Sequence, residues 1–304
     1  MRPQILVART RGYCAGVARA VGAVEDLLAE SDGPVYVRHA IVHNTRVVNE
    51  LAERGAVFVE RNEDVPAGAA LVLSAHGSAP AVVDDARERG LRIVDATCPL
   101  VTKVHREVAR FVDDGYTVLI IGDPNHVETI GVAGVRPGRA IVVPDEASAE
   151  AIEPPSRRLA VVAQTTLDPR RLASVLAVLQ RRFTGLALPS RSDICYATVN
   201  RQSAARELAR AVQRAVVVGS GNSANSRHLR EVIEEEGCPA VLIDDVALLD
   251  LAAFAGLERI GVTAGASAPE TLVDEIVGTL ATSLGAEVTE FGPSETPMTF
   301  APVG

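Results

Sequence analysis

The chain has 304 residues, of which 47% are apolar and 23% are charged, a composition typical of a soluble globular protein and not of a disordered or fibrous one. A net charge of −9 with no run of Lys or Arg argues against nucleic-acid binding. No apolar stretch reaches the roughly 18 residues of a membrane span, and the first one is too short for a signal peptide, so we expect a cytoplasmic protein whose cysteines are reduced.

Short apolar runs alternate with helical patterns along the whole chain. Because these runs are continuous and not alternating, they predict parallel strands that helices cover on both faces, an α/β fold. In chain order the expected strands cover residues 5–8, 34–37, 70–75, 92–96, 116–122, 159–163, 215–219, 240–244 and 259–264.

Three features recur in the same order along the chain. A cysteine opens an amphipathic helical pattern at Cys14, Cys98 and Cys195. After each of these helices, a strand ends at a pair of polar residues, and a later strand ends at a polar loop. The repeat predicts three similar α/β lobes around an approximate threefold axis, covering residues 1–97, 98–193 and 194–304, with a C-terminal tail.

The three repeated cysteines are candidate metal ligands. Each is expected at the carboxyl end of a strand and at a helix N-terminus, which favours a thiolate. Three soft ligands without a nearby fourth favour a [4Fe–4S] cluster with one open iron at the centre of the lobes. Each cysteine, taken singly, is equally well read as a small core residue. Cys238 lies off the repeat and is interpreted as structural.

Polar residues at the ends of the other strands form a candidate anion site, because glycine-rich loops at helix N-termini expose backbone N–H groups. Singly, each histidine more often makes a structural hydrogen bond, and His43, His76 and His126 gain weight because the repeat brings them together. Glu128 follows such a strand and is a candidate proton donor, or else an exposed loop acid. Thr165 is the corresponding donor in the second lobe, or else a helix cap. The anion-site residues are His43, His76, His126, Ser223, Asn225 and Ser267.

The sequence resembles the 4-hydroxy-3-methylbut-2-enyl diphosphate reductase (LytB/IspH) family. The matching stretches span residues 11 to 269 and read RGYCAGV, YVRHAIVHN, SAHG, DATCPLVTKVH, QTTL, DICYATVNRQ, VVGSGNSANS and GVTAGASAP. The resemblance implies three α/β lobes around a [4Fe–4S] cluster held by Cys14, Cys98 and Cys195. It also implies reductive dehydroxylation of an allylic diphosphate to isopentenyl and dimethylallyl diphosphate, the last step of the non-mevalonate (MEP) pathway.

The resemblance further assigns roles to the polar residues. It implies diphosphate contacts from His43, His76, Ser223, Asn225 and Ser267, with His126 nearby. It implies that Glu128, together with His126 and Thr165, supplies protons to the substrate hydroxyl. Because a cluster passes single electrons, a ferredoxin or flavodoxin is the implied electron donor.

The sequence departs from the family pattern near these residues. Asp123 stands where a histidine is usual, Ala224 where a serine is usual, and Ala18 and Ala40 where acids are usual. All three cysteines are kept. Two alternatives therefore stay open: a divergent paralogue that reduces another allylic diphosphate, and a non-catalytic cluster or zinc protein. The sequence does not define the product ratio, the oligomeric state or the retention of the open-site iron.

Overall fold

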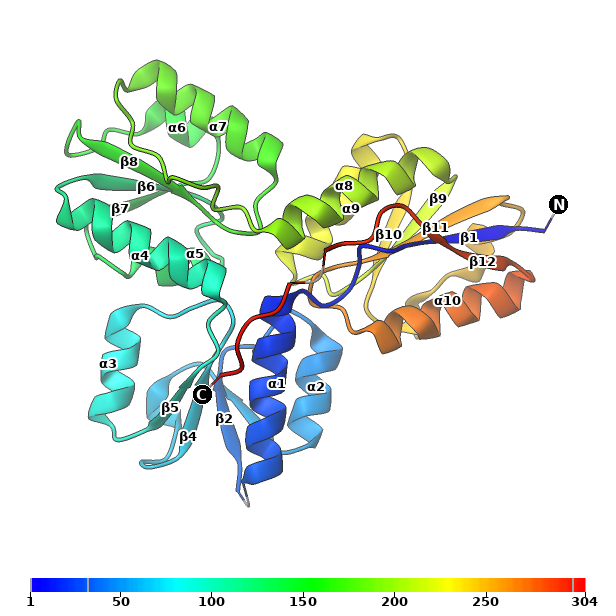
Figure 1. The fold of residues 1–304 in the computed structure, drawn as a ribbon, viewed down its shortest axis with the longest axis horizontal. Helices are drawn as coiled ribbons and strands as arrows, with labels where there is room; N and C mark the ends of the chain where they lie inside the picture. The colour runs from blue at the N-terminus through cyan, green and yellow to red at the C-terminus, as the bar shows by residue number, and fades with distance from the viewer. Residues whose placement is uncertain (1, 32, 297, 304) are drawn as a thin grey trace. The chain divides into compact units, whose positions relative to one another are not determined.

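The computed structural model describes residues 2–31, 33–296 and 298–303. Its strands form three sheets of five, four and three strands, and all the strand pairs in these residues are parallel. The α/β class with parallel sheets is therefore confirmed (Figure 1). Within the described residues, no helix combines the length and apolar character that a membrane crossing requires.

The four-stranded sheet has the order β3-β2-β4-β5, and the three-stranded sheet has the order β7-β6-β8. Helices and strands alternate along the segment that forms these two sheets, from α1, which follows Cys14, to α7. They are α1 (Ala15–Glu30), β2 (Val35–Arg38), α2 (Thr45–Glu53), β3 (Ala56–Val59), η1 (Asn62–Asp64), β4 (Ala70–Leu73), α3 (Pro80–Glu88), β5 (Arg92–Asp95), α4 (Pro99–Asp113), β6 (Thr117–Ile121), α5 (Val127–Ala133), β7 (Ala140–Val143), α6 (Glu146–Ala151), β8 (Leu159–Ala163) and α7 (Pro169–Arg182).

The five-stranded sheet has the order β10-β9-β11-β1-β12, so it contains both the first strand of the fold and the last one. Strand β1 lies between β11 and β12 and pairs with both, so the first strand belongs to the sheet of the last segment (Figure 1). Its elements are β1 (Gln4–Ala8), α8 (Tyr196–Ala211), β9 (Arg214–Val218), α9 (Ala224–Glu235), β10 (Ala240–Ile243), η2 (Val246–Leu248), η3 (Leu251–Phe254), β11 (Arg259–Ala264), α10 (Glu270–Leu284) and β12 (Glu287–Phe291).

The chain forms two compact units. Unit 1 contains Met1–Ala18, His43–Glu50 and Tyr196–Thr299, and therefore the five-stranded sheet; unit 2 contains Arg19–Val42, Leu51–Cys195 and Phe300–Gly304, with the other two sheets. The strands fall in the three predicted segments with the exception of β1. The lobe boundaries after residues 97 and 193 stay predictions.

Strands β6 and β8 of the three-stranded sheet are buried on both faces. Leu119 and Ile121 of β6 pack in a cluster with residues of α6 and α7, whereas Val118 and Ile120 pack with residues of α4 and α5. Adjacent side chains of a strand point to opposite faces, so this partition requires a helix layer on each side of the sheet. Burial of both faces explains why the strand sequences are continuous apolar runs.

Local signals place the helix starts. Asp145 caps α6 by accepting from Ser148 N at 2.7 Å, and Asp168 caps α7 by accepting from Arg170 N at 2.6 Å. Pro80, Pro99 and Pro169 occupy the first turns of α3, α4 and α7, where a missing N–H costs no helical bond. These signals fix where each loop at a strand end turns into a helix, and the candidate site residues lie in those loops.

Candidate active site

The three repeated cysteines occupy equivalent backbone positions. Each directly precedes a helix: α1 begins at Ala15, α4 at Pro99 and α8 at Tyr196. The backbone N–H of each is held by a carbonyl of a strand-end loop. These bonds run from Cys14 N to Ala266 O at 3.1 Å, from Cys98 N to Ala75 O at 3.0 Å and from Cys195 N to Thr165 O at 2.9 Å. The predicted equivalence of the cysteines therefore has a structural counterpart.

The fourth cysteine has a different environment. Cys14, Cys98 and Cys195 are partly exposed, whereas Cys238 is buried and packs in an apolar cluster with residues of α8 and α9. Burial raises the pKa of the Cys238 thiol, because a thiolate is poorly solvated there. Cys238 thus behaves as a core residue, in line with its structural interpretation.

The donor chemistry of the three cysteines fits an iron–sulfur cluster. Their side chains are partly exposed, each directly precedes a helix of 15 or 16 residues, and cysteine sulfur is the ligand that holds iron–sulfur clusters in proteins. In the described part of the chain no three His, Cys, Asp or Glu side chains are grouped so as to hold a metal ion. In a cluster, each thiolate binds its own iron, so the three sulfur atoms do not share a single ion.

Glu128 and Thr165 form a buried pair in unit 2. Glu128 lies in the first turn of α5, beyond β6, and Thr165 follows β8, the neighbouring strand. Thr165 N donates to Oε1 of Glu128 at 2.6 Å, and Thr165 Oγ1 donates to Oε2 at 2.9 Å. Both residues are less than 5% exposed. Glu128 is therefore not an exposed loop acid, and Thr165 holds it at both carboxylate oxygens.

Burial raises the pKa of Glu128 from 4.5 to about 7. The two hydrogen bonds from Thr165 lower it, since they favour the carboxylate, and the negative charge of Asp193 raises it. Desolvation dominates. A carboxyl group with this pKa exchanges its proton near neutral pH, as a general acid must.

Two histidines accompany this pair. His126 caps α5: its Nδ1 accepts from Glu128 N at 3.2 Å, so in the neutral ring the proton is on Nε2. The His76 ring lies edge-on to the His126 ring, with the centroids 5.8 Å apart. Unit 2 thus brings together four of the predicted residues, His76, His126, Glu128 and Thr165.

Unit 1 holds the other predicted polar residues at the ends of β9 and β11. Asn225 is buried; its Oδ1 accepts from Ala266 N at 2.8 Å, while its Nδ2 has no partner in the described residues. Ser223 caps α9 by accepting from Ser226 N, and Ser267 Oγ donates to His43 O at 2.9 Å. The unused amide group of Asn225 is a buried donor of the kind that an anionic oxygen satisfies.

The loops of unit 1 are closely packed around Ser226. A Cβ on Gly265 would lie 2.0 Å from the Ser226 hydroxyl oxygen, and a Cβ on Gly219, where φ is 154°, would lie 2.3 Å from it. Only glycine fits at these two positions. This close approach sets the distance between the start of α9, which carries Asn225 after its cap residue Ser223, and the loop after β11.

Comparisons with known proteins identify the family of this chain. The family model described as "LytB protein" matches residues 5–281. The chain belongs to the LytB family. It is 48% identical to a 4-hydroxy-3-methylbut-2-enyl diphosphate reductase of Neisseria meningitidis over 91% of this chain and 86% of that one. It is 45% identical to the enzyme of that name from Psychrobacter arcticus over 98% of this chain and 95% of that one.

A solved structure extends the likeness to the fold. The E-1-hydroxy-2-methyl-but-2-enyl-4-diphosphate reductase of Plasmodium falciparum matches with a TM-score of 0.93 at 33% identity, over 99% of this chain and 96% of that one. The LytB family and its fold therefore both extend over nearly the whole chain.

The positions that depart from the family pattern are peripheral to the hydrogen bonds described above. Ala18 and Asp123 are exposed, and the Asp123 carboxylate accepts from Asn125 N within its own turn. Ala224 is buried in the first turn of α9, next to the cap residue Ser223, which keeps its capping bond. The substitution at 224 removes a hydroxyl group without removing the helix cap.

Sequence reasoning missed a cluster of charges beside Cys195. Asp193 is 6% exposed; its Oδ1 accepts from Lys103 Nζ at 2.8 Å and its Oδ2 from Ala163 N at 2.9 Å. Glu107 lies beside it, and burial together with Asp193 raises the pKa of Glu107 to about 7. The stretches DATCPLVTKVH and DICYATVNRQ contain Lys103 and Asp193, but only the fold places them side by side.

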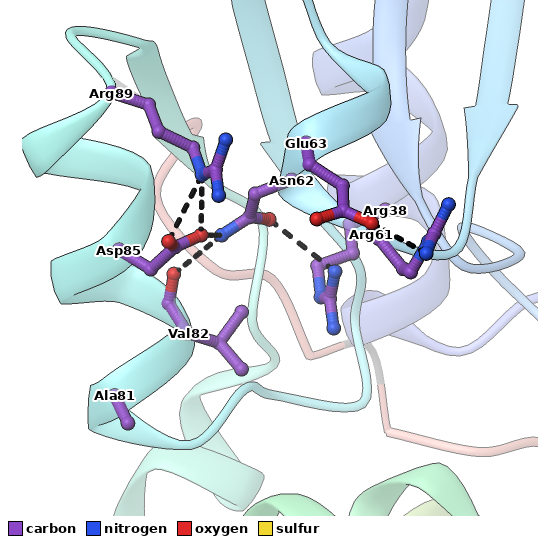
Figure 2. Close-up of a pocket in the computed structure, with 8 residues that line it drawn as sticks. All are labelled: Arg38, Arg61, Asn62, Glu63, Ala81, Val82, Asp85 and Arg89. Carbon is purple, nitrogen blue, oxygen red and sulfur yellow. Dashed lines mark hydrogen bonds and ion pairs between the residues drawn. The ribbon is translucent and has the colours of Figure 1, made fainter.

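A cavity of about 320 Å³ lies elsewhere in unit 2 and contains none of the predicted site residues (Figure 2). Its polar groups bind one another: Asn62 joins Arg38, at 3.3 Å, to Asp85, at 2.8 Å, and Arg89 donates to Asp85 at 2.9 Å. Because these charges already have partners within the lining, the cavity offers no separate site. It is lined by Arg38, Arg61, Asn62, Glu63, Ala81, Val82, Asp85 and Arg89.

Proposed function

We propose that this protein reduces 4-hydroxy-3-methylbut-2-enyl diphosphate to isopentenyl and dimethylallyl diphosphate, the last step of the non-mevalonate pathway. Membership of the LytB family and the names of its relatives support this assignment. The observation that carries it is the buried Glu128–Thr165 pair, because water loss from an allylic alcohol needs a proton donor that works near pH 7.

The reaction consumes two electrons and two protons for each substrate. The allylic C–O bond breaks, the hydroxyl group leaves as water with one proton, and the second proton forms a C–H bond. A [4Fe–4S] cluster held by Cys14, Cys98 and Cys195, when bound, supplies the electrons and an open iron for the hydroxyl oxygen. We assign its reduction to a one-electron carrier, a ferredoxin or a flavodoxin, in the cytoplasm, where thiols stay reduced.

Glu128 and Thr165 hold and move the proton. When Glu128 is protonated, its O–H donates to Thr165 Oγ1. The Thr165 hydroxyl then passes its own proton to the hydroxyl group of the substrate and receives the proton of Glu128. The N–H of Thr165 keeps Oε1 fixed during the transfer. His126, protonated on Nε2 in its neutral form, donates to the substrate beside them.

The diphosphate is bound by donors and not by formal cations. Asn225 contributes its partnerless Nδ2, and Ser223 contributes its hydroxyl proton, since its oxygen accepts the capping bond. His43 and His76 complete the set of donors, and the Ser267 hydroxyl, which donates to His43 O in this structure, exchanges that bond for a diphosphate oxygen. A neutral donor set suits a protein of net charge −9, because the donors act locally whatever the overall charge.

The test is anaerobic purification of the full chain followed by measurement of iron, acid-labile sulfide and product formation in one preparation. Four irons, four sulfides and turnover to the two C5 diphosphates are expected. Absence of iron and sulfide after reconstitution would refute the cluster assignment. A full cluster that turns over another allylic diphosphate, and not this one, would refute the substrate.

A further inference from the structure

The helix that follows each cysteine carries one cationic side chain near its start. Arg19 and Lys103 lie five residues after their cysteines (14 to 19, 98 to 103), and Arg201 lies six after its own (195 to 201). In each case the cation donates to a backbone carbonyl that lies one to four residues before a different cysteine. The repeat predicted from the sequence therefore extends to contacts that the proposed function does not use.

Lys103 of α4 makes the most extensive of these contacts. Its Nζ donates to Arg191 O at 2.9 Å, to Ser192 O at 3.2 Å and to the buried carboxylate of Asp193 at 2.8 Å. These three residues lead into Cys195. The helix that begins after Cys98 thus holds the segment that carries Cys195.

Arg201 of α8 acts in the same way on the first cysteine. Its side chain is fully buried; Nη2 donates to Gly12 O at 2.8 Å and to Tyr13 O at 3.4 Å, and Nε donates to Gly12 O at 3.2 Å. Glu295 balances its charge, with Oε2 at 3.3 Å from Nη1. A buried guanidinium directed at carbonyl groups is costly unless each bond is made, so this contact fixes the backbone before Cys14.

Arg19 of α1 completes the pattern. Its Nη1 donates to Thr97 O at 3.1 Å, the carbonyl next to Cys98, and its Nε donates to Ala301 O at 2.8 Å. The order is cyclic: the helix after Cys14 holds the residue before Cys98, the helix after Cys98 holds those before Cys195, and the helix after Cys195 holds those before Cys14.

We propose that Arg19, Lys103 and Arg201 are positioning residues that fix the three cysteine thiolates for the cluster. This inference rests on the proposed function. Each cysteine is fixed on two sides, since its own N–H is bonded to a strand-end loop and a preceding carbonyl is bonded to a cation. Ligands held in this way keep their geometry when the cluster changes charge.

Lys103 provides the sharpest test, because it is partly exposed and contacts three residues before one cysteine; its loss leaves the buried Asp193 carboxylate with the Ala163 N–H bond, so a stability control is required. The variants are Lys103→Met, the conservative Lys103→Arg, and the control Arg106→Met, which removes an exposed charge from the same helix. A second control, Val175→Ala, truncates a fully buried side chain of α7 and lowers stability away from the contact. Should Lys103→Met fail to fold, Arg19→Met tests the same point at Thr97.

The readouts on the anaerobically reconstituted full chain are the EPR spectrum of the reduced cluster, its midpoint potential and the rate of iron loss in air. Groups that orient metal ligands typically change metal affinity about 10–100-fold, so Lys103→Met is expected to lose iron about 10-fold faster than wild type and to alter the EPR spectrum. Lys103→Arg is expected to restore both, and Arg106→Met to match wild type.

The outcomes separate this inference from the proposed function. A wild-type chain that binds no cluster refutes both. A wild-type cluster with turnover, together with unchanged spectrum, potential and iron loss in Lys103→Met, refutes the positioning role alone. Equally fast iron loss in Val175→Ala at a matched melting temperature also refutes it, because general destabilisation would then explain the effect.

Discussion

Replacing Thr165 by valine tests the origin of the Glu128 pKa. The substitution keeps the backbone N–H that donates to Oε1 and removes only the hydroxyl that donates to Oε2 at 2.9 Å. That hydroxyl stabilises the carboxylate, so its loss raises the pKa of Glu128 above about 7. A hydrogen bond to a charged group is worth roughly 1.5–3 kcal/mol, which corresponds to a rise of about 1–2 pH units.

The pH dependence of kcat/KM measures this shift. Because the acid must be protonated, the rate of the wild-type enzyme falls as pH rises through about 7, and in Thr165→Val this fall moves to higher pH while the maximal rate drops. Thr166→Val is the matched control, because it also removes one threonine hydroxyl, which in this case accepts from Gln164 Nε2. An alkaline limb that stays in place or moves to lower pH in Thr165→Val would refute the assignment of the limb to Glu128.

Three further substitutions test the proposed proton donor, the proposed anion site and the packing of the loops around Ser226. Glu128→Gln is expected to lower kcat by about 10²–10⁴-fold and to abolish the alkaline limb; an unchanged limb would assign it elsewhere. Asn225→Asp keeps the oxygen that binds Ala266 N but replaces the free donor by a charged acceptor, so steady-state kinetics should show KM raised at least about 10-fold. Gly265→Ala places a Cβ against the Ser226 hydroxyl and is expected to destabilise the protein by about 1–3 kcal/mol in chemical denaturation, with recovery in the double variant with Ser226→Gly.

The continuous apolar runs were sufficient to predict the parallel α/β fold, and the sequence repeat was sufficient to predict the equivalent positions of the cysteines. It works because strand-end loops of one sheet meet at one edge, so that residue type and order alone place Thr165 beside Glu128. It failed for β1, which was assigned to the first segment but pairs with β11 and β12. A single apolar run carries no information about which sheet it joins.

The C-terminal segment shows a second limit of pattern reading. The described residues after β12, 292–296 and 298–303, lack regular structure, and the sequence predicts a tail. In the structure, Glu295 pairs with the buried Arg201, Pro293 O accepts from Thr10, and Ala301 O accepts from Arg19. Such contacts join residues far apart in sequence through single side chains, so no periodic pattern in the sequence predicts them.

Thr165 connects the proposed proton donor, Glu128, to a proposed cluster ligand, Cys195. Its side chain and N–H hold Glu128, while its carbonyl accepts from Cys195 N. A displacement of this loop would therefore change the acid and the ligand together, whereas a side-chain substitution at 165 changes the acid alone. The loop is fixed from its other end by Asp168, which caps α7, so the backbone position of Thr165 is set by a helix start that takes no part in the chemistry. Proton supply and cluster geometry are for this reason separable by mutation although one residue carries both.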